Sequence, residues 1–156
     1  GRSLPTAVAA LLAATTVALA TAGMSMTSAL AARAMAASVL KGIATAHLHL
    51  IEAEGATLIE EGKITGALTG EARAELHAGG VFRARFTIKT RAGYIFGEGE
   101  AKPSGDGRYQ SFKGTFRATH GSGRYAHIKG QAELYGVYDR EKESATIQTV
   151  GGKLTY

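Results

Sequence analysis

From residue 44 onward, apolar and polar residues alternate with a period of two, and glycines interrupt the alternation at short intervals. The run 81–92 is the clearest, because every second residue from Phe82 to Ile88 is apolar and the residues between them are Arg or Thr. Similar runs predict strands at Thr45–Ala53, Gly62–Leu68, Glu71–His77, Val81–Ala92, Tyr94–Ala101, Ser111–Thr119, Gly130–Tyr138 and Ala145–Gly151. We therefore expect an all-β chain forming a single antiparallel β-barrel of about eight strands, with a two-sheet sandwich as the alternative.

The composition of the chain changes near residue 40. No charged residue occurs from Ser3 to Ala32, whereas every Phe and Tyr lies at or beyond Phe82. A hydrophobic core must therefore come from the second part of the chain, which is long enough for one domain. We assign residues 1–36 to an N-terminal segment and 37–156 to the β-barrel domain.

The N-terminal segment reads as an apolar, helical export signal. Arg2 precedes an apolar stretch from Pro5 to Gly23, and Ala29-Leu30-Ala31 has the small-x-small pattern of a cleavage site. Cleavage here would leave a secreted or cell-envelope protein. The alternative is a retained helix that anchors the chain in a membrane or packs in an assembly, since the uncharged run is long enough to span a bilayer.

Cysteine content and charge exclude several classes of function. The chain has no Cys, which removes disulfides, zinc–thiolate sites and cysteine nucleophiles. Its net charge is +5, and over residues 41–156 sixteen Lys or Arg stand against thirteen Asp or Glu. This balance does not favour nucleic acid as a partner.

A ten-residue segment occurs twice. Gly105–Gly114 and Gly121–Gly130 are identical at six of ten positions, and both contain Gly-x-Gly-Arg-Tyr. The offset of sixteen residues is close to one strand plus one connection, so the copies are expected to be equivalent loops entering successive strands. Two interpretations remain for the repeated pairs: they line one rim of the barrel and bind a ligand, or the Tyr plugs a barrel end. The residues concerned are Arg108, Tyr109, Arg124 and Tyr125.

The second copy and its neighbours resemble a known family of barrels. Gly121-Ser-Gly-Arg-Tyr-Ala-His-Ile-Lys-Gly130 is similar to the Gly-Gly-Thr-Gly-x-Phe-x-x-Ala-x-Gly segment of the allene oxide cyclase and dirigent barrels. The strands at 112–116 and 134–138 and the ending Thr146–Thr149 fit small secreted bacterial proteins of that type. The resemblance implies the fold rather than the activity, because its motif is made of turn glycines and none of the cyclase's catalytic positions matches.

His47 and His49 are the strongest indication of a metal-binding site in the sequence. They are two residues apart on a predicted strand and so share a face, and Glu54 follows in a His-x-His-x4-Glu pattern. The pattern is similar to the first motif of cupins, whose jelly roll is a second alternative for the fold. Arg108 stands where the second cupin motif has its third His, and a guanidinium does not bind a metal. Ordinary strand histidines are the alternative interpretation.

A further set of basic residues is expected on the outer side of the sheet. These residues predict one cationic face that binds an anionic surface, or else the solvated side of an antiparallel sheet. They are Arg83, Arg85, Lys89, Arg91, Lys113 and Arg117.

These patterns favour an exported, non-catalytic module that binds a small apolar ligand or a surface partner, or serves a structural role. We expect no cofactor. The alternatives are a cyclase or isomerase, a cupin-like metal enzyme, and a subunit that the N-terminal helix anchors in a membrane or joins into a filament or homo-oligomer. An enzyme requires ionisable side chains converging in a pocket. If Phe82, Phe86, Phe112 and Phe116 fill the interior, the function must lie on the outside.

Overall fold

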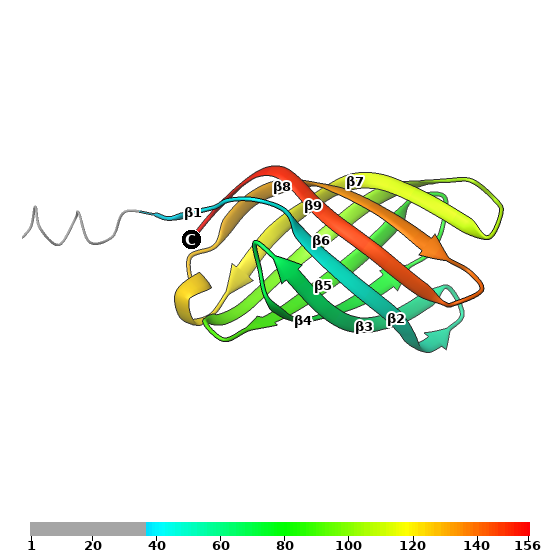
Figure 1. The fold of residues 1–156 in the computed structure, drawn as a ribbon, viewed down its shortest axis with the longest axis horizontal. Helices are drawn as coiled ribbons and strands as arrows, with labels where there is room; N and C mark the ends of the chain where they lie inside the picture. The colour runs from blue at the N-terminus through cyan, green and yellow to red at the C-terminus, as the bar shows by residue number, and fades with distance from the viewer. Residues whose placement is uncertain (1–36) are drawn as a thin grey trace, which may run out of the picture. The chain divides into compact units, whose positions relative to one another are not determined.

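The computed structural model describes residues 37–156, so the predictions for the export signal or retained helix lie outside the described residues. The elements are β1 (Val39–Leu40), β2 (Ala44–Glu54), β3 (Thr57–Gly66), β4 (Gly70–His77), β5 (Phe82–Thr90), β6 (Gly93–Ser104), β7 (Tyr109–Gly121), the 3₁₀ turn η1 (Gly123–Tyr125), β8 (Lys129–Asp139) and β9 (Ser144–Thr155) (Figure 1). Within residues 37–156 no helix has both the length and the apolar composition needed to cross a bilayer.

The strands form a closed antiparallel barrel. Each strand from β2 to β8 pairs with the next one along the chain, and β9 pairs with both β8 and β2. The short strand β1 pairs with the last residues of β9. Closure confirms the predicted single barrel of eight strands and excludes the two-sheet sandwich, and it leaves few unpaired edges on which other chains could add strands.

The alternation in the sequence predicts every strand of the barrel, and β3 is the one it misplaces most. The expected strand was 62–68, whereas β3 runs from Thr57 to Gly66. Its first half breaks the alternation because Glu60 points into the barrel and is only 2% exposed. An inward Glu is atypical of a barrel strand, and its consequences are described below.

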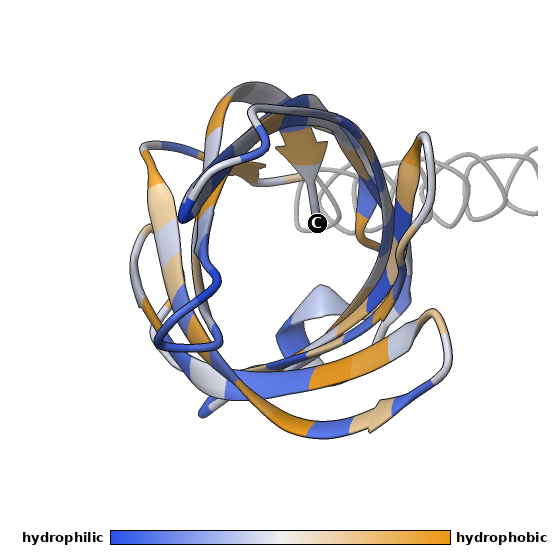
Figure 2. Ribbon diagram, turned by 90° about the vertical axis from the view of Figure 1, so that its right-hand side faces the viewer, coloured by the Kyte–Doolittle hydropathy of each residue, from blue (hydrophilic) through white to orange (hydrophobic). Residues whose placement is uncertain are grey.

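The connections between strands define two ends of the barrel. The plug end has the connections 41–43, 67–69, 91–92 and 122–128 together with the end of β9, and the cavity end has the connections 55–56, 78–81, 105–108 and 140–143. At the plug end, η1 places Tyr125 in the interior, where its ring packs edge-to-face on Tyr156 with centroids 5.0 Å apart. Figure 2 views the barrel from the cavity end, with the turn η1 at the far end.

Small residues on β6 make room for aromatic rings from the strands on either side. Gly97 and Gly99 are buried on the inner face of β6. A Cβ on Gly97 would lie 2.4 Å from the Phe116 ring, and one on Gly99 would lie 2.7 Å from the Phe86 ring. The rings of Phe86 and Phe116 consequently meet above β6, with centroids 5.8 Å apart.

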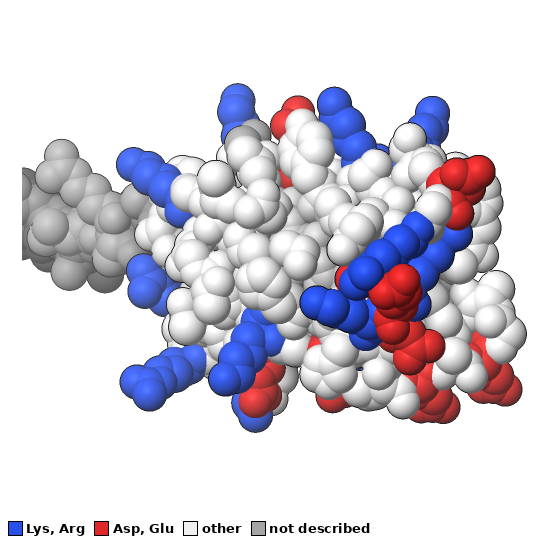
Figure 3. All heavy atoms as spheres, turned by 45° about the vertical axis from the view of Figure 1, so that its right-hand side comes forward, with Lys and Arg blue, Asp and Glu red and all other residues white. Residues whose placement is uncertain are grey.

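The outer face of β5, β6 and β7 carries mixed charge, which corrects the prediction of one cationic face. Glu100 pairs with Arg83 at 3.4 Å, and Glu98 pairs with Arg117 at 2.8 Å. Glu98 also stands opposite Arg85 in the register of β5 and β6. Counting cations along β5 and β7 missed the acids of β6 that lie between them. Figure 3, which colours residues by charge without naming them, shows basic and acidic side chains beside one another toward the right of its view.

Candidate functional site

The cavity end contains an apolar cavity of about 130 Å³. Strands β3 to β9 all contribute to its wall. Its lining includes Leu58, Glu60, Ala74, Leu76, Ala78, Phe82, Ala84, Phe86, Gly99, Ala101, Gln110, Phe112, Leu134, Tyr138, Arg140, Ala145 and Ile147. The four phenylalanines do not fill the interior completely: Phe116 is buried, whereas Phe82, Phe86 and Phe112 form part of the cavity wall.

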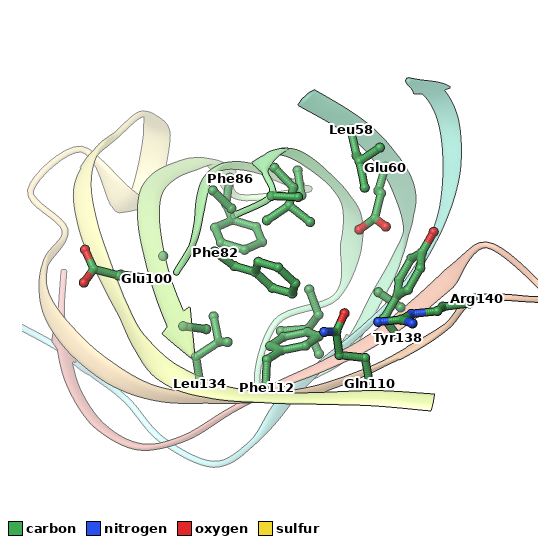
Figure 4. Close-up of a pocket in the computed structure, with 18 residues that line it drawn as sticks. Leu58, Glu60, Phe82, Phe86, Glu100, Gln110, Phe112, Leu134, Tyr138 and Arg140 are labelled. Atoms are coloured by element: carbon green, nitrogen blue, oxygen red, sulfur yellow. The ribbon is translucent and has the colours of Figure 1, made fainter. Parts of the chain in front are cut away.

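Glu60 is the acidic side chain inside this cavity. It faces Leu50 on β2 and Ala74 on β4 in the sheet register, and Figure 4 shows its carboxylate directed into the cavity. Its Oε1 atom is buried and has no hydrogen-bond partner among the described residues. Burial raises the pKa of Glu60 from 4.5 to about 7, because the charged form loses its hydration and gains no compensating contact. The carboxyl group is therefore divided between its protonated and ionised forms near neutral pH.

Tyr138 on β8 lies close to Glu60 at the wall of the cavity (Figure 4). Burial raises the pKa of its hydroxyl, and the negative charges of Glu60 and Glu143 raise it further. The phenol therefore keeps its proton at neutral pH and can donate a hydrogen bond. Glu60 and Tyr138 are therefore neighbouring polar groups in a mainly apolar cavity, without a hydrogen bond between them, whereas the labelled Glu100 points away from it.

A clamp of ionic and hydrogen bonds holds two connections together at the cavity end. Arg108 donates from Nε and Nη2 to the two carboxylate oxygens of Asp139 at 3.1 and 3.0 Å, and its Nη1 lies 2.7 Å from Glu141. Arg140 donates to the backbone carbonyl of Asp106 at 2.8 Å. The hydrogen bond from Arg108 holds the pKa of Asp139 below its usual range. These bonds tie the two connections to each other at the rim beside the cavity.

The repeated Arg-Tyr pairs lie at opposite ends of the barrel, so the interpretation that both line one rim does not hold. Of the two tyrosines, only Tyr125 occupies the interior of a barrel end, as in the other interpretation. Successive connections of an antiparallel meander lie at opposite ends, so Arg108 and Tyr109 are at the cavity end and Arg124 and Tyr125 at the plug end. Arg108 stacks on the Tyr109 ring, which is 58% exposed. Arg124 stacks on Tyr156 and donates to its hydroxyl at 3.2 Å. The cavity wall includes none of the four.

The predicted metal ligands remain apart on the outer face of β2. His47 and His49 are both exposed, and His47 Nδ1 lies 3.3 Å from the hydroxyl of Thr146. A bulge between Leu50 and Glu52 returns Glu54 to their side of the strand. Glu54 is five residues beyond His49, however, or about 16 Å along an extended strand. In the described part of the chain, no three His, Asp or Glu side chains lie close enough together to hold a metal ion.

Three side chains that define the cavity and its rim were not among the predicted site residues: Glu60, Tyr138 and Asp139. Glu60 has one signal in the sequence: it is followed by Glu61, and adjacent residues of a strand point to opposite faces, so one of the two must face the interior. Asp139 and Tyr138 carry no comparable signal. The register between β7 and β8 brings Asp139 to Arg108, and closure of the barrel brings Tyr138 toward Glu60 from a distant part of the sequence.

Comparison with protein-family models, curated proteins and solved structures finds no match for this chain. The resemblance to allene oxide cyclase and dirigent barrels therefore remains a prediction, and the structure supports the closed antiparallel barrel alone. What the cavity does must be argued from its own side chains.

Proposed function

We propose that this barrel is a binding module for a small, mainly apolar ligand that carries one polar group. The main support for this proposal is the carboxyl group of Glu60, which lies inside an apolar cavity without a hydrogen-bond partner. The ligand's apolar body would contact Phe82, Phe86 and Phe112, and its polar group would meet Glu60.

Energetics support this assignment. A buried polar group without a hydrogen-bond partner costs about 1–3 kcal/mol, and native proteins keep few of them. A ligand hydroxyl can donate to the ionised form of Glu60 or accept from its protonated form, which removes this cost. A ligand without a polar group would gain only from burial of its apolar surface.

The size of the cavity limits the buried part of the ligand. Its volume of about 130 Å³ is close to that of an engineered apolar cavity of about 150 Å³ that binds benzene in another protein. One six-membered ring or a short alkyl chain therefore fits within the described lining. The rim residues Gln110 and Arg140 are polar, so any longer part of a ligand would pass polar groups as it leaves the barrel.

The test is calorimetric titration of the full chain at pH 7 with toluene and p-cresol, which differ by one hydroxyl group. We expect both to bind, with p-cresol tighter by about tenfold, since a hydrogen bond to a charged group contributes about 1.5–3 kcal/mol. Glu60→Leu should abolish the preference for p-cresol and retain toluene. Ala84→Leu should fill the cavity and abolish both.

Thr69→Ala, at the exposed β3–β4 turn of the plug end, is the control and should bind both probes like the parent chain. Saturable binding that survives Ala84→Leu would place the site elsewhere. A parent chain that binds neither probe would overturn the proposal.

A second candidate function is an isomerase or cyclase, like that of the family the sequence resembles. It is favoured by the proximity of Glu60 and Tyr138 at the cavity wall. A carboxylate with a pKa of about 7 can act as a base at neutral pH, and a protonated phenol beside it can stabilise an enolate oxygen. In this reaction the ionised Glu60 would take an α-proton from a bound ketone, and Tyr138 would donate a hydrogen bond to the enolate oxygen.

Cyclohexanone in deuterated water tests this candidate, because enolate formation and return replaces its α-protons by deuterons. An isomerase would accelerate the exchange, as followed by proton NMR, and Glu60→Gln would abolish the acceleration. Saturable binding of cyclohexanone without faster exchange would leave the binding module as the function.

A further inference from the structure

The plug end carries a ring of basic side chains. Six Lys or Arg lie in its connections or within two residues of them, and Glu71 is the one acidic residue of the described chain in the same positions. We name these six residues the basic ring: Lys41, Lys89, Arg91, Arg124, Lys129 and Lys153. Figure 3 shows Lys and Arg projecting at its left-hand end, with the acidic side chains of that view farther to the right.

The basic ring lacks ionic partners within the barrel. All six side chains belong to exposed residues, and none forms an ion pair with a carboxylate of residues 37–156. The connections of the cavity end, with the two residues on either side of each, contain five acidic and four basic residues. Two of these basic residues, Arg83 and Arg108, are paired with carboxylates. The positive charge of the domain is therefore concentrated at one end and available to an external anion.

Apolar and aromatic side chains lie next to the basic ring. Val39 and Ile43, on either side of Lys41, are each 49% exposed. On the outer face near the same end, Tyr94 stacks on Phe96, and Phe96 stacks on His120 with centroids 4.4 Å apart. Cations flanked by exposed aliphatic and aromatic groups are typical of surfaces that lie against lipid headgroups.

The shape of the basic ring favours a flat partner over a linear one. Its residues come from the break between β1 and β2, the β5–β6 and β7–β8 connections and the end of β9, so they are spread around the barrel end. Lys89 and Arg91 border a hollow beside the β3–β4 turn, and the other four lie outside it. A planar anionic surface can contact all of them at once, whereas a single polymer strand would reach only some. The chain also enters the barrel here, since β1 pairs with the last residues of β9, and the segment that precedes it has no charge from Ser3 to Ala32.

We propose that the plug end docks on an anionic phospholipid bilayer and that the cavity end faces away from it. The basic ring binds the headgroups, Val39 and Ile43 contact the interfacial region, and the cavity stays accessible to ligand from the opposite side. This proposal is independent of what the cavity binds.

The experiment compares the full chain on vesicles of phosphatidylcholine with and without phosphatidylserine. Arg2 and Arg33 of the N-terminal segment are the same in every variant, so a change in the ratio of the two affinities between parent and variant reports on the barrel. The double variant Lys89→Glu and Arg91→Glu should lower this ratio by about tenfold or more, because each Lys or Arg near an anionic surface contributes several-fold in affinity. The control, Lys102→Glu with Lys142→Glu, makes the same change in net charge near the cavity end and should change the ratio by less than about twofold.

Orientation gives a second readout, because the absence of Cys allows single labels. A fluorophore on Thr69→Cys, at the plug end, should be quenched by spin-labelled lipid, and one on Gly107→Cys, at the cavity end, should not. Equal losses in the two double variants, or quenching at Gly107→Cys, would overturn the proposal. So would binding to soluble heparin in preference to the vesicles, which would identify a polyanionic polymer as the partner.

Discussion

The two ends of the barrel contain copies of the same ten-residue segment, yet one end is packed shut and the other holds a cavity. At the plug end, η1 directs Tyr125 inward against Tyr156. At the cavity end, β7 begins at Tyr109, whose exposed ring stacks on Arg108, and Asp139 binds that Arg. The position of each copy relative to the start of its strand therefore decides whether the repeated Tyr supports the core or the surface.

The two ends also differ in what their interior side chains contribute: those of the plug end stabilise the fold, and those of the cavity end favour binding. The plug end buries aromatic and aliphatic side chains without an interior charge, whereas the cavity end keeps the unpartnered Glu60. Packing at the first end stabilises the barrel, and the buried carboxyl at the second destabilises it at neutral pH. Such an unfavourable residue in a pocket is expected where binding, rather than stability, selects the side chain.

The largest difference in stability between the two ends should come from replacing the repeated tyrosines, one at a time. Tyr125→Ala should lower the free energy of unfolding by about 3 kcal/mol, since it empties a buried aromatic site. Tyr109→Ala, its equivalent in the first copy, should change it by less than about 0.5 kcal/mol, because that ring is largely exposed. Urea denaturation of the two variants measures both. Similar losses would show that the two ends are equally dependent on the repeat.

The second prediction concerns the pH dependence of stability. The pKa of Glu60 is about 7 in the folded barrel against 4.5 in an unfolded chain, so the folded state holds a proton between these values that the unfolded state has lost. The contribution of Glu60 to stability is thus fully present below pH 4.5 and is lost as the pH rises through about 7, a decrease of at most about 3 kcal/mol. Glu60→Gln does not titrate and should abolish this decrease, so it should be more stable than the parent chain at pH 8.

Denaturation at several pH values between 4.5 and 8 checks this prediction. Glu61→Gln, on the outer face next to Glu60, is the matched control and should keep the slope of the parent chain because Glu60 is still present. The pKa of Asp139 is lowered by Arg108, so its own contribution to stability is lost only as the pH falls through that low value, below this range. An unchanged slope in Glu60→Gln would mean that Glu60 is hydrated or paired in solution.

The sequence predicts the barrel better than its site, for a physical reason. Alternation reports which face of a strand is buried, and it identified all eight strands of the barrel from side-chain polarity alone. It is least accurate at β3, where Glu60 breaks the pattern, and Glu60 is the centre of the proposed site. The bonds of Arg108 to Asp139 and of Arg140 to Asp106 connect residues more than thirty positions apart, so they depend on the register between β7 and β8 and not on any local pattern.

The third prediction compares the free space at the two ends. Ala118, buried on β7 toward the plug end, and Ala84, on β5 in the cavity wall, both point into the barrel. Ala118→Leu should lower the free energy of unfolding by about 1–3 kcal/mol, because a packed interior has no room for three more carbon atoms. Ala84→Leu should be neutral or stabilising, since those atoms enter the cavity. Equal destabilisation would show that the cavity does not exist in solution.

The smallest effects are expected from neutralising one acidic residue at the plug end and one between the two ends. Glu98 on β6 pairs with Arg117 on β7 and stands opposite Arg85 on β5, so Glu98→Gln should lower the free energy of unfolding by less than about 1 kcal/mol, and by nothing measurable in high salt. Glu71 stands opposite Lys63 and Lys89 in the register at the plug end and makes no ion pair with a described residue, so Glu71→Gln should affect stability even less.

The two substitutions differ, however, in their expected effect on lipid binding. Both raise the net charge by one, but only Glu71→Gln removes a negative charge from the basic ring and should strengthen binding to phosphatidylserine vesicles by several-fold. Glu98→Gln should leave that affinity nearly unchanged, because Glu98 lies between the two ends, away from the proposed contact surface. If the two variants gained affinity equally, net charge rather than its placement at the plug end would control binding, and the two ends would be electrostatically equivalent.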